Sequence, residues 1–361
     1  MFIQQILHKP ELSKADIVCL LNATGEDMGL LFNHAARIKQ QYIGNTVHLR
    51  ALVELSNSCE KDCYYCGIRK SNSNVHRYSM SEDEVLESVR FAYENGYGSV
   101  AIQSGEIQSP AFTEKINRIL LKTREMTNGE LGITLSCGEQ TEETYRKWME
   151  AGANRYLLRI ETSNPELYRK LHPNDDIHRF ERRLEALEML KKTGYQVGTG
   201  VMIGLPFQTI ENLADDLLFM KQFDIDMCGM GPYIEHHETP LFAYKDSLMP
   251  LKERFNLSLK MIAILRILMP DINIAATTAL QTIEKNGREQ AIQIGANVLM
   301  PNITPRKYRD DYFLYENKPV SIQSNEDDLK VLEKSLAEIG CRIGYGEQGN
   351  SRRFYKNQLN P

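Results

Sequence analysis

Eight short apolar runs, separated by amphipathic segments, constrain the fold of this 361-residue chain more than any other feature. The segments between the runs carry helix signals, such as Ser81 with Glu84 three residues later, which together form a capping box. Several of these segments end at a glycine, as at Gly96, Gly152 and Gly194. The predicted strands lie at residues 49–56, 99–104, 132–137, 155–161, 197–204, 226–233, 272–278 and 296–301. This alternation is typical of parallel strands joined by crossover helices.

Eight such units predict a closed (βα)8 barrel of the TIM type, because closure leaves no unpaired strand edge. A doubly wound open sheet is the alternative architecture. We expect residues 1–45 to form an N-terminal helical segment packed on the barrel, residues 46–315 to form the barrel, and residues 316–361 to form a C-terminal helical extension. The last helix is predicted at residues 327–340.

Composition narrows the possible partners and the compartment. The formal net charge is −5 and no long basic run is present, so we expect no nucleic-acid partner. The first residues lack a basic start followed by an apolar core, and the most apolar later stretch is interrupted by Arg266, so we expect no membrane segment. An odd number of cysteines, seven, argues against a disulfide framework and predicts a cytoplasmic protein.

Three of the cysteines form a closely spaced triplet, Cys59, Cys63 and Cys66, directly after the first predicted strand. Thiolates hold iron-sulfur clusters, which usually take one cysteine for each iron, so a triplet leaves one iron open. The remaining cysteines lack matching spacing. A structural zinc knuckle, which usually has four protein ligands, and ordinary cytosolic thiols are the alternative interpretations. The triplet lies where a barrel places its active site, at the carboxyl end of a strand.

Polar residues also follow other predicted strands, and a barrel would bring them to the same mouth. Arg159 and Glu161 lie two residues apart, so they share one face of their strand, and an inward charge must find a partner or ligand. The other residues of this kind are Ser104, Gly105, Glu106, Thr134 and Ser136. Together with the triplet they predict a site at the barrel mouth.

The triplet resembles the hallmark of radical S-adenosylmethionine (SAM) enzymes, including the aromatic residue, here Tyr65, before the last cysteine. The resemblance implies that Cys59, Cys63 and Cys66 bind one 4Fe-4S cluster, whose open iron SAM chelates through its amino and carboxylate groups. Reduction then yields a 5′-deoxyadenosyl radical.

The same resemblance implies roles for the residues around the cofactor. Ser104, Gly105 and Glu106 correspond to the segment near the methionine amino group, and Tyr65 lies beside the adenine. Arg183 would pair with the methionine carboxylate, as a fixed cation can. The complete predicted set of cofactor-binding residues is Tyr65, Ser104, Gly105, Glu106, Thr134, Ser136, Glu161 and Arg183.

Longer segments, among them TLSCGE, AGANRYLLRIETSNPELYRKLHP and GLPFQTIENLADDLLFMK, resemble the FeFe-hydrogenase maturase family HydE of the biotin-synthase-like branch, over about residues 45–315. The resemblance implies synthesis of the dithiomethylamine bridge of the hydrogenase H-cluster from a small-molecule or organometallic substrate. It implies other hydrogenase maturases as partners and an external electron donor. Arg159, Thr277 and Thr278 match positions at which the family binds anionic groups of the substrate.

The sequence departs from many family members in the C-terminal segment, which has no cysteine before Cys341. One distant cysteine cannot hold a second cluster, so we expect a single cluster. Two alternatives stay open: a methylornithine-synthase-like or other radical SAM enzyme acting on a small amino-acid-derived substrate, and a non-catalytic iron-sulfur scaffold. The run Glu235 to Glu238 is interpreted as a solvated loop, since adjacent residues point to different sides.

Overall fold

The computed structural model describes residues 2–319 and 325–359 and contains all eight predicted strands. Their positions agree with the apolar runs, although several strands are shorter than predicted. The barrel strands are β1 (Thr46–Ser56), β2 (Ser99–Ser104), β3 (Gly132–Ser136), β4 (Arg155–Leu157), β5 (Gln196–Thr199), β7 (Met227–Cys228), β9 (Asn273–Ile274) and β10 (Val298–Leu299).

The strands pair in the order β10-β1-β2-β3-β4-β5-β7-β9, and every pair is parallel. The two ends of this path meet through a parallel bridge between Ala275 and Val298. Two backbone hydrogen bonds join the same edges, from Ala276 N to the Val298 oxygen and from Asn297 N to the Ile274 oxygen, each at 2.9 Å. The closed barrel is therefore confirmed, and the open sheet is excluded.

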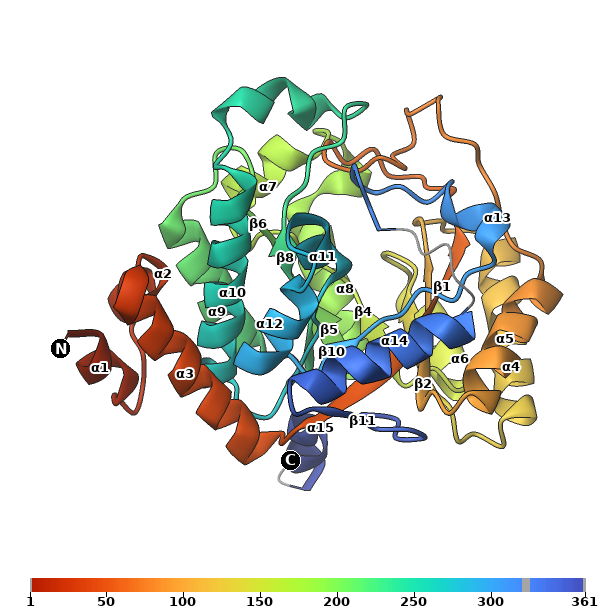
Figure 1. Cartoon of the computed structure of the whole chain (residues 1–361). Helices are drawn as coiled ribbons and strands as arrows, with labels where there is room; N and C mark the ends of the chain where they lie inside the picture. The colour runs from red at the N-terminus through yellow and green to blue at the C-terminus, as the bar shows by residue number, and fades with distance from the viewer. Residues whose placement is uncertain (1, 320–324, 360–361) are drawn as a thin grey trace.

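Helices surround the barrel, with α3 packed on α10 and α12 on one side and α4 packed on α5 on the opposite side (Figure 1). The predicted capping box at Ser81 and Glu84 begins α4. The helices are α1 (Phe2–Leu7), α2 (Lys14–Leu21), α3 (Gly25–Tyr42), α4 (Glu82–Glu94), α5 (Pro110–Met126), α6 (Glu142–Glu150), α7 (Pro165–Leu171), α8 (Phe180–Thr193), α9 (Ile210–Phe223), α10 (Leu251–Leu268), α11 (Thr278–Ile283), α12 (Gly287–Ile294), α13 (Arg306–Arg309), α14 (Asn325–Glu338) and α15 (Arg352–Leu359), with 3-10 turns at Asp176–His178 and Pro240–Ser247. In the part of the chain that the structure describes, no helix is both long and apolar enough to cross a membrane.

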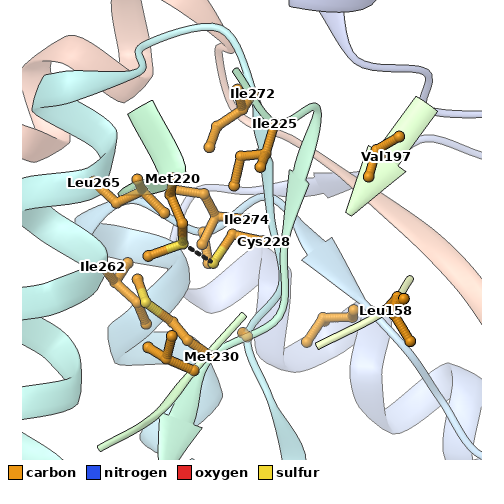
Figure 2. Packing of buried hydrophobic residues seen from close by; sticks show 14 of the residues in the cluster. Leu158, Val197, Met220, Ile225, Cys228, Met230, Ile262, Leu265, Ile272 and Ile274 are labelled. Carbon is orange, nitrogen blue, oxygen red and sulfur yellow. Dashed lines mark hydrogen bonds between the residues drawn. The ribbon is translucent and has the colours of Figure 1, made fainter. Parts of the chain in front are cut away.

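Apolar side chains fill the layer between the strands and the helices. Figure 2 shows part of this layer, where Met220 of α9 and Ile262 of α10 face Cys228 of β7 and Ile274 of β9. The sulfur atoms of Cys228 and Met220 lie 3.6 Å apart. All four side chains are at most 2% exposed, so this layer fixes the helices against the barrel wall.

Several predicted strands end or break before their expected ends. Residues 197–204 divide into β5 and β6 (Met202–Ile203), and residues 226–233 divide into β7 and β8 (Gly231–Pro232). Glycine lets the two chains pass close together at the breaks, because a Cβ on Gly200 would lie 2.6 Å from the carbonyl carbon of Gly229. Beyond it, β6 and β8 form a separate parallel pair. Residues 155–161 similarly end as a strand at Leu157, which leaves the chain free to turn near Glu161.

The C-terminal extension contacts the barrel through a strand and a turn, and not only through a packed helix as predicted. Its strand β11 (Arg342–Ile343) pairs with the start of β1, and the following turn reaches the opposite end of the barrel from the cysteine triplet. There Arg155 Nη1 donates to the Gln348 oxygen at 3.0 Å and to Asn350 Oδ1 at 2.6 Å. Of the predicted extension, residues 320–324 and 360–361 lie outside the described residues.

Candidate active site at the barrel mouth

A cavity of about 370 Å³ lies inside the barrel and opens at the carboxyl ends of the strands. This volume falls in the range of small-molecule sites. The predicted site residues that line it are Cys59, Cys63, Tyr65, Cys66, Ser104, Gly105, Glu106, Ser136, Arg159, Glu161, Arg183, Thr277 and Thr278. The fold therefore gathers residues from six barrel segments around one enclosed space.

The loop that carries the cysteine triplet is held by its own hydrogen bonds. Arg77 donates to the carbonyl oxygens of Asn57 at 2.6 Å, Ile68 at 2.7 Å and Arg69 at 2.6 Å. At Gly67 a Cβ would collide with the Phe313 oxygen, so the loop passes close beneath the later chain. One guanidinium thus satisfies carbonyls that this irregular loop cannot pair within a sheet.

The three thiols of the triplet are free and largely buried. Burial raises the pKa of Cys59, raises that of Cys63 to about 12 and raises that of Cys66 well above its usual value. A bound metal would reverse this trend, since coordinated thiols lose their protons. Within residues 2–319 and 325–359, no three His, Cys, Asp or Glu side chains are close enough to hold one metal ion. A 4Fe-4S cluster distributes its thiolates over several irons, so the triplet need not surround a single ion to hold one.

Glu106 lies beside the triplet in a network of buried charges. Its backbone N–H donates to Cys59 Sγ at 3.3 Å, and its carboxylate lies 3.2 Å from Lys61 Nζ and 3.9 Å from Arg183 Nη2. Burial, aided by the nearby Glu139 carboxylate, raises the pKa of Glu106. The preceding Gly105 lets the backbone approach closely, because a Cβ there would lie 2.8 Å from the Cys59 Cβ.

Arg159 and Glu161 form an ion pair at 3.0 Å on the cavity wall, although both lie beyond the end of β4 and not on the strand as expected. Glu161 adopts a left-handed backbone conformation with φ of 65°, which is costly for a residue other than glycine. Burial raises the pKa of Glu161, although its Oε2 atom lies 3.0 Å from Arg159 Nη2. A carboxylate has about four acceptor sites, so a strained carboxylate at a cavity can still accept hydrogen bonds from a ligand hydroxyl or amine.

Tyr65 is oriented by a neighbouring histidine. Burial lowers the pKa of His172 to about 3, so this ring is neutral. The Nδ1 atom of His172 lies 2.9 Å from the backbone carbonyl oxygen of Tyr168, which can only accept a hydrogen bond. Nδ1 therefore carries the proton, and Nε2 is the acceptor. The Tyr65 hydroxyl then donates to Nε2 at 3.3 Å. This chain of contacts fixes the aromatic ring at the cavity wall.

Thr134 is the one predicted cofactor residue that does not line the cavity. Its hydroxyl accepts a hydrogen bond from Arg155 Nε at 3.0 Å, on the side of the barrel covered by the C-terminal turn. Thr134 and Ser136 share a face of β3, but two residues along a strand separate them by about 7 Å. Only Ser136 reaches the cavity, so Thr134 is removed from the proposed cofactor set.

Two charged residues of the network were not singled out from the sequence. Lys61 lies inside the cysteine motif and lines the cavity, and Glu139 follows β3 and is 1% exposed. Lys61 Nζ lies 2.9 Å from Glu139 Oε2, and Arg183 Nε donates to Glu139 Oε1 at 2.6 Å. A signal was available, since Glu139 stands at a strand end within the segment TLSCGE.

Comparisons with known proteins agree with this geometry. A family profile described as the radical SAM superfamily matches residues 53–220. The [FeFe] hydrogenase maturase subunit HydE of Thermotoga maritima is 45% identical over 324 residues, covering 90% of this chain and 89% of that protein. A 3-methylornithine synthase of Methanosarcina acetivorans is 28% identical, covering 94% and 92%. The crystal structure of methylornithine synthase superposes with a TM-score of 0.80 at 25% identity, covering 96% of this chain and 98% of the other.

A closed barrel with a cysteine triplet at its mouth and a matching superfamily profile defines a radical SAM enzyme. Within that class, the identity over nine-tenths of the chain shows that this protein belongs to the HydE family.

The residues present fit the cofactors of this class. Three thiols lie at the mouth, Gly105 allows close backbone approach, and the buried carboxylates of Glu106 and Glu161 line the cavity.

Proposed function

We propose that this protein acts in FeFe-hydrogenase maturation, in the synthesis of the dithiomethylamine bridge of the H-cluster. The observation that carries the proposal is the barrel cavity, which has the cysteine triplet at its mouth and Arg159, Thr277 and Thr278 on its wall. The 45% identity to a hydrogenase maturase supports the substrate class. The substrate would be a small amino-acid-derived or organometallic precursor.

In this proposal Cys59, Cys63 and Cys66 would hold one 4Fe-4S cluster, beside which the cavity residues would bind SAM. When bound and reduced, this pair supplies a 5′-deoxyadenosyl radical. The residues of the chain bind and orient SAM. Glu106 accepts from the methionine amino group, and Glu161 accepts from the nucleoside. The complete proposed cofactor set is Tyr65, Ser104, Gly105, Glu106, Ser136, Glu161 and Arg183.

Arg159 presents a guanidinium to an anionic group of the substrate, and the barrel wall keeps water away from the reacting centre. The hydroxyl of Thr277 donates to the Met230 oxygen at 3.4 Å, a long bond that a substrate acceptor could replace. Thr278 begins α11 beside it. An external electron donor and other hydrogenase maturases are the expected partners, and free thiols throughout the chain support a cytoplasmic setting.

The chemistry is tested by anaerobic cluster reconstitution, dithionite reduction and measurement of 5′-deoxyadenosine released from SAM. The wild-type protein is expected to form 5′-deoxyadenosine, and a variant with Cys59, Cys63 and Cys66 all replaced by alanine is expected to form none. Cleavage of SAM by the triple variant would contradict the site assignment.

The biological role needs a separate assay, in which apo-hydrogenase is matured by an extract that lacks only this protein. Added wild-type protein is expected to restore hydrogen evolution. The similarity to methylornithine synthase over 96% of the chain favours a second candidate, an amino-acid rearrangement. Formation of 3-methylornithine from a mixture of amino acids, without restored maturation, would support that candidate instead.

A further inference from the structure

Glu139 is a buried carboxylate that lies behind the cavity wall and does not line the cavity. Three cations surround it. Lys61 lies 2.9 Å away, Arg183 donates to it at 2.6 Å, and Arg182 donates to it at 2.9 Å. These contacts hold the pKa of Glu139 at about 2 in spite of its burial, with Arg183 and Lys61 as the main opposing causes. The side chain is therefore a fixed anion at neutral pH.

Two of those cations also face Glu106 on the cavity side. Lys61 Nζ lies between the two carboxylates, 2.9 Å from Glu139 and 3.2 Å from Glu106. Arg183 is similarly divided, because its Nε donates to Glu139 while its Nη2 is 3.9 Å from Glu106. The closer partner is Glu139 in both cases. Glu106 consequently keeps acceptor capacity that a stronger pairing with these cations would occupy.

The backbone fixes the two carboxylates relative to each other. Gly138 precedes Glu139 with φ of 72°, and a Cβ at this position would lie 2.5 Å from the Glu106 Cβ. Arg183 Nη1 also donates to the Arg159 oxygen at 2.5 Å, which connects this network to the neighbouring strand end. Glu139 is thus anchored on one side by packing and on the other by three charge-assisted hydrogen bonds.

We propose that Glu139 is a positioning residue for the methionine end of SAM, which it serves by drawing Lys61 and Arg183 away from Glu106. The inference rests on the proposed location of SAM and not on the identity of the substrate. Without the anion at Glu139, both cations would turn to Glu106 and occupy the oxygens that accept from the methionine amino group. The effect of Glu139 would therefore be confined to the methionine end of SAM.

The test compares Glu139→Gln with the wild-type protein, both carrying reconstituted cluster, by calorimetric titration. Methionine is titrated in saturating 5′-deoxyadenosine, and 5′-deoxyadenosine is titrated alone. Glutamine has the same shape without the charge, so we expect methionine and SAM to bind about tenfold more weakly and 5′-deoxyadenosine to bind within about twofold. The electron paramagnetic resonance change of the reduced cluster at saturating SAM should be retained.

Arg182→Gln is the matched control, because Arg182 contacts Glu139 from the outer side and does not line the cavity. Its methionine affinity should stay within about twofold of wild type. If Glu139→Gln loses its cluster, Glu139→Asp replaces it, and its expected loss of about two- to fivefold should again be confined to the methionine end.

Equal losses at both ends of the cofactor, or no loss, would overturn the proposal. If Glu139→Gln shows the expected affinity losses but the wild-type protein does not support hydrogenase maturation, the result counts against the proposed function alone.

Discussion

At the scale of single residues, Gly105 is a position where the loop that carries the cysteine triplet lies in close contact with the end of β2. A Cβ at Gly105 would collide with the Ser58 oxygen and would lie 2.8 Å from the Cys59 Cβ. Neither neighbour is the free end of a flexible side chain, so the cysteine loop itself would have to shift. The role of Gly105 could be anticipated from its place after a strand, but the identity of the colliding atoms required the folded chain.

We therefore expect Gly105→Ala to reduce cluster incorporation by more than half, because Cys59 would move relative to the other two cysteines. Iron and sulfide content and the visible absorbance of the reconstituted protein measure this. Gly29→Ala is the control, since Gly29 lies in α3 with nothing within 4 Å of an added Cβ. That change should leave the cluster intact and stabilise the protein by about 0.5–1 kcal/mol. Full cluster content in Gly105→Ala would refute the argument.

At the scale of elements, the strands were predictable and their ends were not. The apolar runs located every barrel strand, because a buried parallel strand needs continuous apolar sequence. The run at residues 155–161 contains a strand of only three residues, and Glu161 beyond it has a positive φ that no sequence pattern indicated. Thr134 was misplaced for a related reason, since strand alternation shows which face a residue takes but not its depth in the barrel.

Asp216 of α9 holds the turn that follows Glu161. Ser163 donates to Asp216 Oδ1 through its backbone N–H at 2.5 Å and its hydroxyl at 2.6 Å. Burial raises the pKa of Asp216 to about 7, although these hydrogen bonds oppose the shift. The protonated form is therefore favoured in the folded state, and the contribution of Asp216 to stability is complete below its unfolded pKa of about 4.

That contribution should be lost as pH rises from about 4 to about 7, by on the order of 2–4 kcal/mol. We expect Asp216→Asn, which cannot ionise, to gain stability relative to wild type over this interval. Urea unfolding of both proteins at pH 5 and pH 8 measures the difference in unfolding free energy between them at each pH. The other carboxylates are the same in both proteins, so their pH-dependent contributions cancel in this difference. A difference that does not change with pH, or that changes in the opposite direction, would show that Asp216 does not titrate in this range.

At the scale of the whole molecule, the C-terminal turn covers the end of the barrel opposite the cysteine triplet. Two buried guanidiniums, Arg50 and Arg155, face this turn, and neither forms an ion pair with a carboxylate of residues 2–319 or 325–359. Arg50 Nη2 donates to the Gly349 oxygen at 3.4 Å, and Arg155 donates to Gln348 and Asn350. Helix α14 could be predicted from its periodicity, whereas α15 was not predicted. The contacts of the C-terminal turn join residues almost 200 and almost 300 positions apart, and they left no local signal in the sequence. The division into residues 1–45, 46–315 and 316–361 stays a prediction.

Asn350→Ala should lower the free energy of unfolding by about 2–4 kcal/mol, because Asn350 Oδ1 accepts from both Arg155 Nη1 and Gln196 Nε2. Equilibrium urea unfolding followed by circular dichroism measures the change. The control is Asn357→Ala, since Asn357 is exposed and donates to Asp224, and this change should cost less than about 0.5 kcal/mol. Equal stability of the two variants would show that the turn does not support the barrel.

The covered barrel end also affects how the barrel can fold. Residues 348–350 supply carbonyl and amide oxygens to Arg50 and Arg155, which precede them by about 200 to 300 residues in the sequence. Until these acceptors are in place the two guanidiniums stay hydrated, because a buried guanidinium without acceptors is costly. Closure of the barrel around Arg50 and Arg155 therefore depends on contacts of high sequence separation, which form slowly.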